Sequence, residues 1–243
     1  MNLLALDTST DILSIAVARA DQRWLHSGAG GAQSSSHLLP AVRALMAESG
    51  LAFTALDAIV FGRGPGSFTG LRTACAISQG LAFAASSQRD TELPVLPVDT
   101  LMAVAEEARL LHGCTQVLAC MDARMDEVYS AAYSYNGTQW QLDSELRVCP
   151  PEDVSAPAGY VVAGNAHAAY GDRLLPAAQH VAAMPTANAL LNLAPALLAH
   201  GLAVPAKDAL PLYIRDKVAK TTAEREAIKQ AQLAAETATP PQA

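Results

Sequence analysis

The chain has 243 residues, of which 51% are hydrophobic, so it is long enough to bury one large core or two small ones. Its formal net charge of −7, with only 16 lysines and arginines, argues against a protein that binds nucleic acid by itself, because neutralising phosphates requires clustered positive charge. The N-terminus lacks the pattern of a secretory signal and no uncharged run reaches the roughly 20 apolar residues that cross a bilayer, which predicts a cytoplasmic protein with no membrane contact.

The apolar pattern of the first half alternates between strand and helix periodicity. The first three strands follow one another across short turns and predict a meander, whereas each later strand is followed by a helix, which predicts a sheet with helical crossovers. Gly50 can end the first helix, and Pro40 must lie in its first turn or bend it. We expect strands at residues 3–6, 12–19, 23–27, 58–61 and 94–98, and helices at 34–49, 69–85 and 100–111.

The second half repeats the opening of the chain. The segments "LALDTSTD" at 4–11 and "ACMDARMD" at 119–126 each run from an apolar strand into a turn with an aspartate at either end, and Trp24 and Trp140 lie 17 and 18 residues after the first of these aspartates. An internal duplication explains this match, although a strand, an aspartate and a turn also coincide by chance. Further elements are expected as strands at 128–135, 138–142 and 160–163 and as a helix at 187–200.

These patterns predict an α/β protein with two lobes of related topology. The first lobe is expected to span residues 1–112 and the second, smaller lobe residues 113–218. Residues 219–243 lack a sustained stripe of bulky apolar side chains and end in Thr, Pro, Gln and Ala, so we expect a frayed or disordered tail.

The glycine-rich stretch "GRGPGSFTGLR" after the strand at 58–61 has two interpretations. Gly64 and Gly66 permit positive φ angles and close backbone approach, and Ser67 can cap the following helix, whose N-terminal amides attract anions. The spacing matches neither a Walker A loop, which requires a lysine, nor a nucleophile elbow, nor the dinucleotide-binding fingerprint. The stretch therefore predicts either a strand-to-helix turn or a phosphate contact.

Two helices carry stripes that favour close packing. Small residues recur at three- and four-residue steps along the helix at 69–85, and a second apolar stripe follows the helix at 34–49. Periodicity alone does not say what lies opposite a stripe, so a partner protein and the chain's own core are both open interpretations. The residues concerned are Leu38, Val42, Leu45 and Met46 in the first helix and Leu71, Ala74, Cys75, Ser78 and Ala82 in the second.

Five motifs spread over residues 1–219 resemble one family. "LLALDTST", "SSSHLLPAV", "GRGPGSFTGLRTACAISQGLA", "MDARMDEVY" and "LYIRDKVA" are similar to the TsaB (YeaZ) family, the partner subunits in bacterial tRNA threonylcarbamoyladenosine (t6A) synthesis. The resemblance implies the two-lobed, actin-like ASKHA fold of actin, hexokinase and Hsp70, built from a duplicated βββαβαβα-type domain with a reduced second lobe. That fold accounts for the internal repeat.

The resemblance also implies that no metal is bound. In the related catalytic subunit TsaD an H-x-x-x-H motif binds metal, and Thr100 and Val104 stand at the corresponding positions of "LPVDTLMAV". None of the six histidines has another histidine four residues away, and the four cysteines show no C-x-x-C or zinc spacing, which is typical of reduced core thiols. We interpret Asp7 and Asp122 as remnants of the nucleotide site of the fold. Weak anion or nucleotide contacts are predicted at Asp7, Thr8, Gly64, Gly66, Ser67, Asp122 and Arg124.

The resemblance implies a non-catalytic subunit. We expect the helices at 34–49 and 69–85 to pair with a TsaD-like catalytic subunit, with His37 and Arg72 as polar contacts beside the two stripes, and a TsaE-like ATPase to join the complex. In the family that the chain resembles, the complex transfers a threonylcarbamoyl group to N6 of adenosine 37 of tRNA, which implies that this chain reaches tRNA only through the complex. A homodimer is expected when the chain is alone, with no tightly bound cofactor and weak ATP or ADP at the partner interface.

Two other functions fit the fold less well. A small-molecule kinase would depend on bound Mg-ATP, for which no lysine or second acid completes a site beside Asp7 or Asp122. A metallopeptidase would need metal ligands and a general base, and the sequence offers no such set. Tight Mg-ATP binding with phosphoryl transfer would favour the kinase, and stoichiometric zinc or iron would favour the peptidase.

Overall fold

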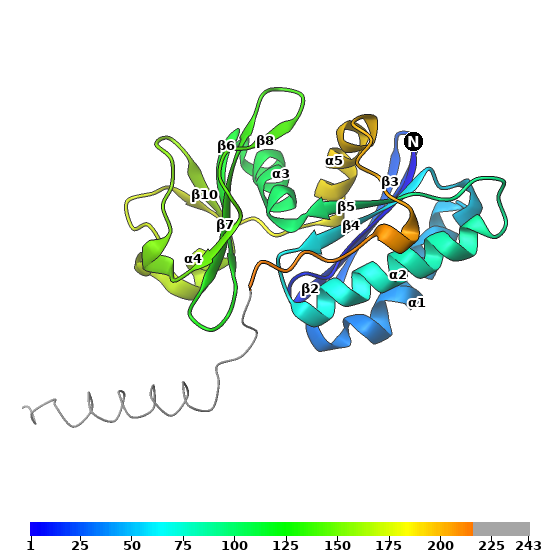
Figure 1. The fold of residues 1–243 in the computed structure, drawn as a ribbon, viewed down its shortest axis with the longest axis horizontal. Coiled ribbons are helices and arrows are strands. Elements are labelled where there is room, and N and C mark those ends of the chain that lie inside the picture. The colour runs from blue at the N-terminus through cyan, green and yellow to red at the C-terminus, as the bar shows by residue number, and fades with distance from the viewer. Residues whose placement is uncertain (216–243) are drawn as a thin grey trace, which may run out of the picture.

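The structure is a computed structural model that describes residues 1–215, so the tail predicted at 219–243 lies outside the described residues. Two sheets stand side by side, each in its own lobe (Figure 1). The five-stranded sheet has the order β3-β2-β1-β4-β5, and the six-stranded sheet has the order β11-β10-β6-β7-β8 with β9 paired to β7. The predicted α/β class and two-lobed arrangement are confirmed.

The first sheet begins with the predicted meander. The strands β1, β2 and β3 pair antiparallel, and β4 and β5 then add parallel to β1 on its other side, each reached through a helix. The strands span β1 (Asn2–Asp7), β2 (Ile12–Arg19), β3 (Gln22–Ala29), β4 (Ala58–Gly64) and β5 (Val95–Asp99). The helices span α1 (Ser34–Ser49), α2 (Phe68–Ser86) and α3 (Thr100–His112).

Both faces of the first sheet are covered. Because side chains alternate between the faces of a strand, Leu4 and Leu6 of β1 pack with α1 and α2, whereas Leu3 and Ala5 pack with α3 and a later helix, α5 (Ala187–Ala199). The helices α1 and α2 lie on one side of the sheet and α3 and α5 on the other (Figure 1). This explains why the strand at 58–61 reads as a continuous apolar run.

The second lobe repeats the pattern of the first in reduced form. Its strands β6 and β7 pair antiparallel like β1 and β2, and β10 lies parallel to β6 as β4 does to β1. The elements are β6 (Gln116–Asp122), β7 (Val128–Tyr135), β8 (Trp140–Leu142), β9 (Arg147–Cys149), β10 (Val161–Gly164), α4 (Ala166–Tyr170) and β11 (His180–Val181). Short 3-10 helices lie at Gly31–Gln33, Phe53–Ala55, Pro151–Asp153, Gly171–Arg173 and Ala206–Asp208.

The chain returns to the first lobe after β11. The sequence assigned residues 113–218 to the second lobe, but α5 packs on the first sheet, where the Ala187 amide donates to Ser14 Oγ of β2 at 2.9 Å. Val204 then pairs with Val95 at the edge of β5. The physical reason is that the Leu- and Ala-rich α5 covers an apolar sheet face that would otherwise meet water.

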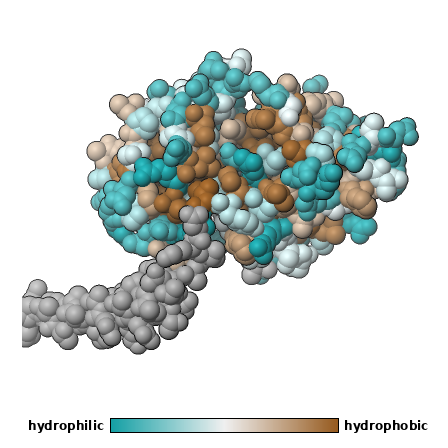
Figure 2. All heavy atoms as spheres, in the orientation of Figure 1, coloured by the Kyte–Doolittle hydropathy of each residue, from teal (hydrophilic) through white to brown (hydrophobic). Residues whose placement is uncertain are grey.

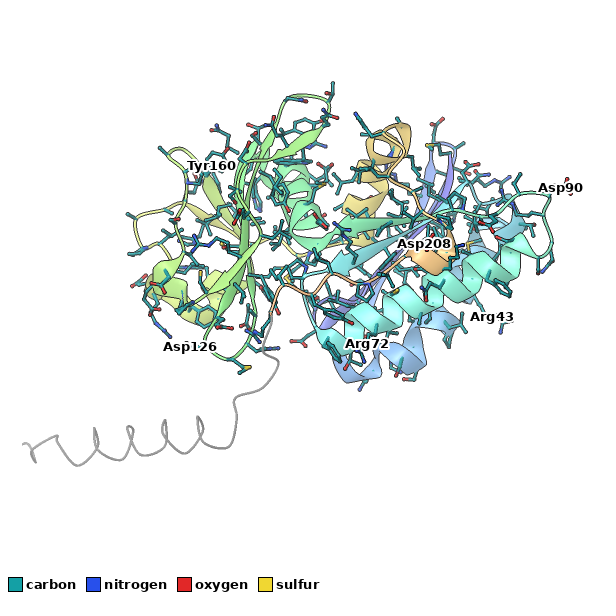
Figure 3. The ribbon with its side chains drawn as sticks, in the orientation of Figure 1. Arg43, Arg72, Asp90, Asp126, Tyr160 and Asp208 are labelled. Carbon is teal, nitrogen blue, oxygen red and sulfur yellow. The ribbon has the colours of Figure 1, made fainter. Side chains whose placement is uncertain are left out.

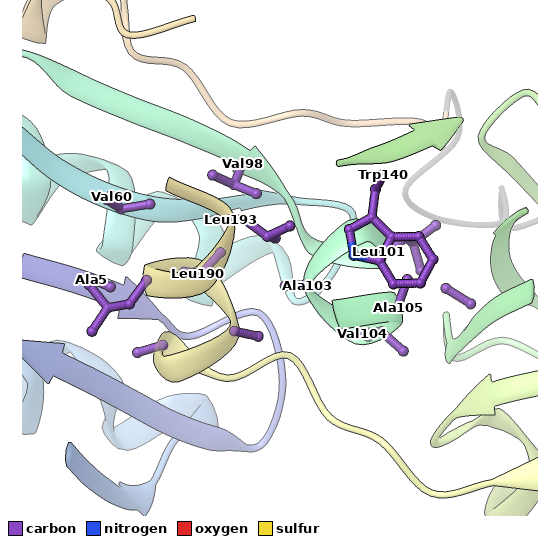
Figure 4. Close-up of a cluster of buried hydrophobic side chains, with 14 of the residues drawn as sticks. Ala5, Val60, Val98, Leu101, Ala103, Val104, Ala105, Trp140, Leu190 and Leu193 are labelled. Atoms are coloured by element: carbon purple, nitrogen blue, oxygen red, sulfur yellow. The ribbon is translucent and has the colours of Figure 1, made fainter. Parts of the chain in front are cut away.

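One apolar cluster joins the two lobes. It runs from Ala5 and Val60 of the first sheet through α3 and α5 to Trp140 of β8 (Figure 4). The Trp140 indole Nε1 donates to the buried carboxylate of Glu106 in α3 at 2.9 Å, and Arg109 pairs with the same carboxylate at 2.7 Å. The helix α3 is therefore anchored to both sheets.

Candidate functional site

The glycine loop connects β4 to α2 and packs on the turn after β1. Ser67 Oγ caps α2 by accepting from the Gly70 amide at 3.4 Å, and the Ser67 amide donates to the Ser9 carbonyl at 2.7 Å. A Cβ atom at Gly66 would lie 2.6 Å from the Ser9 carbonyl oxygen, and one at Gly70 would lie 1.8 Å from that of Thr8. These glycines are therefore required by the chain's own backbone, which supports the interpretation as a strand-to-helix turn.

Asp7 is sealed behind this turn and does not face solvent. Its Oδ1 accepts hydrogen bonds from the Ser9 amide at 3.0 Å and from Ser9 Oγ at 2.7 Å. Among the described residues no group donates to Oδ2, which points at Gly62. Burial raises the pKa of Asp7 to about 6. Such a carboxyl group cannot reach a ligand in a cleft.

The second turn ties up its aspartate in the same way. Asp122 Oδ1 accepts from the Arg124 amide at 2.8 Å and from the Tyr170 hydroxyl at 2.7 Å, and Oδ2 lies 3.1 Å from the Arg124 guanidinium. Burial and the neighbouring Asp122 carboxylate raise the pKa of Tyr170 to about 12. Arg124 also reaches Asp11 of the first lobe at 2.8 Å, so the two repeated turns meet across the opening between the lobes.

A cavity of about 600 Å³ lies between the lobes beside these turns. Of the predicted anion contacts it brings together Gly66, Ser67, Asp122 and Arg124. The predicted contacts at Asp7, Thr8 and Gly64 are wrong for a ligand in this cavity, because all three are buried against neighbouring backbone and side chains. Sequence reasoning missed part of the wall, which includes Phe68, Tyr129, Leu212, Tyr213 and Arg215. Apolar residues gather where the lobes meet on the face in Figure 2.

The predicted apolar interface stripes face the chain's own sheet. The side chains of Leu38, Val42, Ala74 and Ala82 have no exposed surface, and the other predicted apolar positions are also buried. These stripes therefore belong to the core, and the prediction that they contact a partner is wrong. The corrected positions are Leu38, Val42, Leu45, Met46, Leu71, Ala74, Cys75, Ser78 and Ala82.

The outer side of α1 and α2 has a different character. His37 and Arg72 are exposed there, and their role as polar contacts to a partner stays a prediction. A shallow groove runs along α2. Large apolar side chains are also exposed: Phe68 by 42% and Phe83 by 76%. An exposed helical face with apolar groups is a common site of protein association. The groove is lined by Ser35, Phe68, Thr69, Arg72, Thr73, Ala76 and Ile77.

The positions corresponding to the TsaD metal ligands carry structural roles here. Thr100 is fully buried and its Oγ1 accepts from the Gly64 amide at 3.1 Å, while Val104 lies in the interlobe core. Within residues 1–215 no three His, Cys, Asp or Glu side chains form a group that could hold a metal ion. In the same part of the chain, no helix combines the length and apolarity needed to cross a membrane.

Comparisons with known proteins identify the family. Residues 20–223 match the family model of TsaD, tRNA N6-adenosine threonylcarbamoyltransferase. The tRNA threonylcarbamoyladenosine biosynthesis protein TsaB of Escherichia coli is 35% identical over 90% of this chain and 96% of its own, and the TsaB protein of Haemophilus influenzae is 33% identical over 90% and 95%.

A solved structure agrees with these sequence matches. The structure of YeaZ from Pseudomonas aeruginosa is 39% identical and superimposes with a TM-score of 0.80 over 88% of this chain and 99% of its own. Both the sequence and the two-lobed fold are thus similar to the same group of proteins over nearly their whole length. The chain therefore belongs to the TsaB (YeaZ) family, within the wider group of sequences that the TsaD model describes.

Proposed function

We propose that this chain acts in tRNA threonylcarbamoyladenosine biosynthesis as a non-catalytic subunit that binds a TsaD-like catalytic subunit. The observation that carries the proposal is the combination of family membership with an exposed, mostly uncharged outer face on α1 and α2. A TsaE-like ATPase joins the pair, and tRNA is reached through the complex because the chain has a net charge of −7. The proposed compartment is the cytoplasm.

The burial and hydrogen bonding of Asp7 and Asp122 support a non-catalytic role for this chain. Acidic side chains can act in group transfer only if they face the reacting atoms, because a general base or a metal ligand must reach them. Asp7 has no exposed surface, and both oxygens of Asp122 are engaged by Arg124 and Tyr170. The contribution of this subunit is then to hold the catalytic partner in its active arrangement, which is a shift of populations rather than a chemical step.

The outer face of α1 and α2 is the proposed contact surface. Ala76 and Thr73 leave room for a partner helix to approach closely, and Phe68 and Phe83 supply large apolar area. His37 and Arg72 supply hydrogen-bond donors at its edge. The same face would serve a homodimer when the partner is absent, so dimer and complex compete for one surface.

Weak binding of ATP or ADP is proposed at the edge of this surface. Phe68, Thr69 and Arg72 line both the groove on α2 and the interlobe cavity, so a nucleotide there would meet the partner as well. The phosphates would contact two exposed residues, Ser67 at the N-terminus of α2 and the guanidinium of Arg124. Fluorescence anisotropy of labelled ADP should rise only when the TsaD-like subunit is present, and equal binding to the chain alone would contradict this location.

The contact surface is tested by Ala76→Glu, which places a charge in the groove. We expect the affinity for the co-purified TsaD-like subunit, measured by titration calorimetry, to fall at least about tenfold, or 1.4 kcal/mol, because the carboxylate would lose its water in the interface. The matched control is Ala169→Glu on α4, an exposed alanine of the other lobe, which should bind normally. If Ala76→Glu bound the TsaD-like subunit with the affinity of the parent chain, the contact surface would not be the outer face of α1 and α2.

A further inference from the structure

The segment after the last short helix has no role in the function proposed above. Residues 209–215, which include the first half of the motif "LYIRDKVA", run along α2 and cross from the first lobe to the second (Figure 1). Four of them, from Leu212 to Arg215, form part of the wall of the interlobe cavity. The segment thus bridges the opening at which the two lobes would separate.

Its first half is fastened to the first lobe. The fully buried Ala209 accepts hydrogen bonds through its carbonyl oxygen from Gln79 Nε2 at 2.9 Å and from Cys75 Sγ at 3.2 Å. The Leu212 amide donates to the Arg63 carbonyl at 2.7 Å, next to the glycine loop. These contacts fix the backbone of the segment against α2 and the end of β4.

Tyr213 adds a side-chain attachment to the first lobe. Its hydroxyl accepts from Arg72 Nε at 3.0 Å, and its ring lies 5.3 Å from that of Phe68. The Arg72 guanidinium also stacks on Phe68, with its carbon atom 3.8 Å from the ring centre. Arg72 marks the first-lobe side of the opening in Figure 3.

The last described residue is fastened to the second lobe. The Arg215 guanidinium pairs with the carboxylate of Glu127, donates to the Arg124 carbonyl at 3.2 Å and lies over the ring of Tyr129 at 5.8 Å. Only 16% of the Arg215 side chain is exposed. The ion pair between Asp11 and Arg124 also joins the lobes, but its side chains are 79% and 70% exposed, so water and salt weaken it far more.

The turn at 124–126, which Arg215 contacts, has an unfavourable backbone conformation. Arg124, Met125 and Asp126 have φ angles of 59°, 58° and 65°, a left-handed stretch of three residues with side chains. Such residues persist only where their surroundings hold them. Arg215 holds this turn from the first-lobe side through Arg124 and Glu127, and Arg173 holds it within the second lobe by pairing with Asp126 at 2.7 Å.

We propose that residues 209–215 are an intramolecular clasp that fixes the separation of the two lobes, with Arg215 as its attachment to the second lobe. The interlobe core around α3 is the pivot, and the clasp closes the opposite side at the cavity. Release of Arg215 widens the cavity and frees the turn at 124–126. The proposal concerns the chain alone and does not depend on the partner.

The test measures the distance across the opening in the full-length chain. Nitroxide labels on p-acetylphenylalanine at the exposed positions Ser36 of α1 and Ala169 of α4 report it by double electron–electron resonance. An excess of unlabelled chain is added so that a dimer through α1 and α2 contributes no distance between two labelled molecules. We expect Arg215→Ala to lengthen and broaden the distance distribution. Hydrogen exchange at the Leu212 amide, which donates to the Arg63 carbonyl, should accelerate about tenfold. The reason is that the segment is then held at one end only and opens more often.

The matched control is Arg173→Ala. It removes a guanidinium that pairs with the same turn, but the contacts that it cuts, with Asp126 and Glu152, both lie within the second lobe, so the distance distribution should stay as in the parent chain. Glu127→Gln cuts the Arg215 ion pair from the other side and should reproduce the wider distribution if Arg215→Ala does not fold. Unchanged distributions in the folded Arg215 or Glu127 variant, or equal widening in Arg173→Ala, would overturn the proposal.

Discussion

Asp7 shows how a residue that looks functional in the sequence can be a cost to stability. The aspartate ends an apolar strand and starts a polar turn, the usual setting of a phosphate or magnesium ligand in this fold. In the structure its carboxyl group accepts two hydrogen bonds from Ser9 on one oxygen and none from the described residues on the other. Burial without a counter-charge favours the protonated acid and raises its pKa.

Replacing Asp7 with Asn should therefore stabilise the protein at neutral pH. The pKa of Asp7 is about 6 in the folded chain against 3.8 in the unfolded chain, so the unfolded state loses its proton first. The contribution of Asp7 to the free energy of unfolding therefore falls as the pH rises from about 4 to 6, and above pH 6 it stays lower by up to about 3 kcal/mol. In urea unfolding, Asp7→Asn should gain about 1–3 kcal/mol at pH 7 and nothing at pH 3.5.

The exposed acid Asp90, on the loop after α2 (Figure 3), provides the comparison. Asp90→Asn should leave the free energy of unfolding unchanged within about 0.5 kcal/mol at both pH values. A gain for Asp7→Asn that is equal at pH 3.5 and pH 7 would mean that the carboxyl group is not the source of the effect.

The helix α2 has two faces that the sequence does not distinguish. Both carry small or apolar residues, yet Ala74 is fully buried against the sheet and Ala76 is exposed in the groove. The small residues on the inner face let the helix approach β4. The close approach to the turn after β1 also requires that residue 70 has no side chain. Packing on the sheet therefore accounts for the inner stripe, and the outer face is left for association.

The two faces predict opposite effects of the same substitution. Ala74→Glu buries a carboxylate without a partner and should lower the free energy of unfolding by at least about 3 kcal/mol. Ala76→Glu should change the free energy of unfolding by less than about 0.5 kcal/mol, although it weakens binding to the TsaD-like subunit. Urea unfolding followed by circular dichroism measures both. Equal losses for the two variants would mean that the outer face is also packed.

At the scale of the whole molecule, one of the three apolar clusters of the described residues is shared by the two lobes, and each lobe also has a cluster of its own. The shared cluster passes from the first sheet through α3 and α5 to Trp140 (Figure 4). The indole of Trp140 donates a hydrogen bond to the buried carboxylate of Glu106. Neither lobe could unfold alone without exposing apolar surface of the other. The clasp closes the opposite side of the same junction.

The shared core predicts that both lobes unfold in one transition. Trp24 reports on the first lobe and Trp140 on the second, so Trp140→Phe and Trp24→Phe each leave one probe. In each variant the urea midpoint from fluorescence should coincide with the midpoint from far-ultraviolet circular dichroism, as in a two-state transition. Two separated midpoints in Trp24→Phe, which keeps the contact between Trp140 and Glu106, would show that the lobes unfold independently.

The local elements of this protein could be predicted from its sequence because their causes are local. The helix at 34–49 was predicted at its observed bounds, and the repeat of strand, aspartate and turn correctly indicated two related lobes. The five motifs indicated the family that the comparisons show. Propensity, capping and turn chemistry act over a few residues, and a motif records them directly.

The sequence by itself thus determined the order of the longer elements, the duplication and the family, but not the short β9, α4 and β11, and the tertiary structure decided which faces are buried. It placed the stripes of α1 and α2 against their own sheet, brought α5 back to the first lobe, sealed Asp7 behind Ser9 and laid Arg215 across to Glu127. The physical reason is that periodicity shows that a face must be covered but not by what. The covering surface comes from residues far away in the chain, and only their packing identifies it.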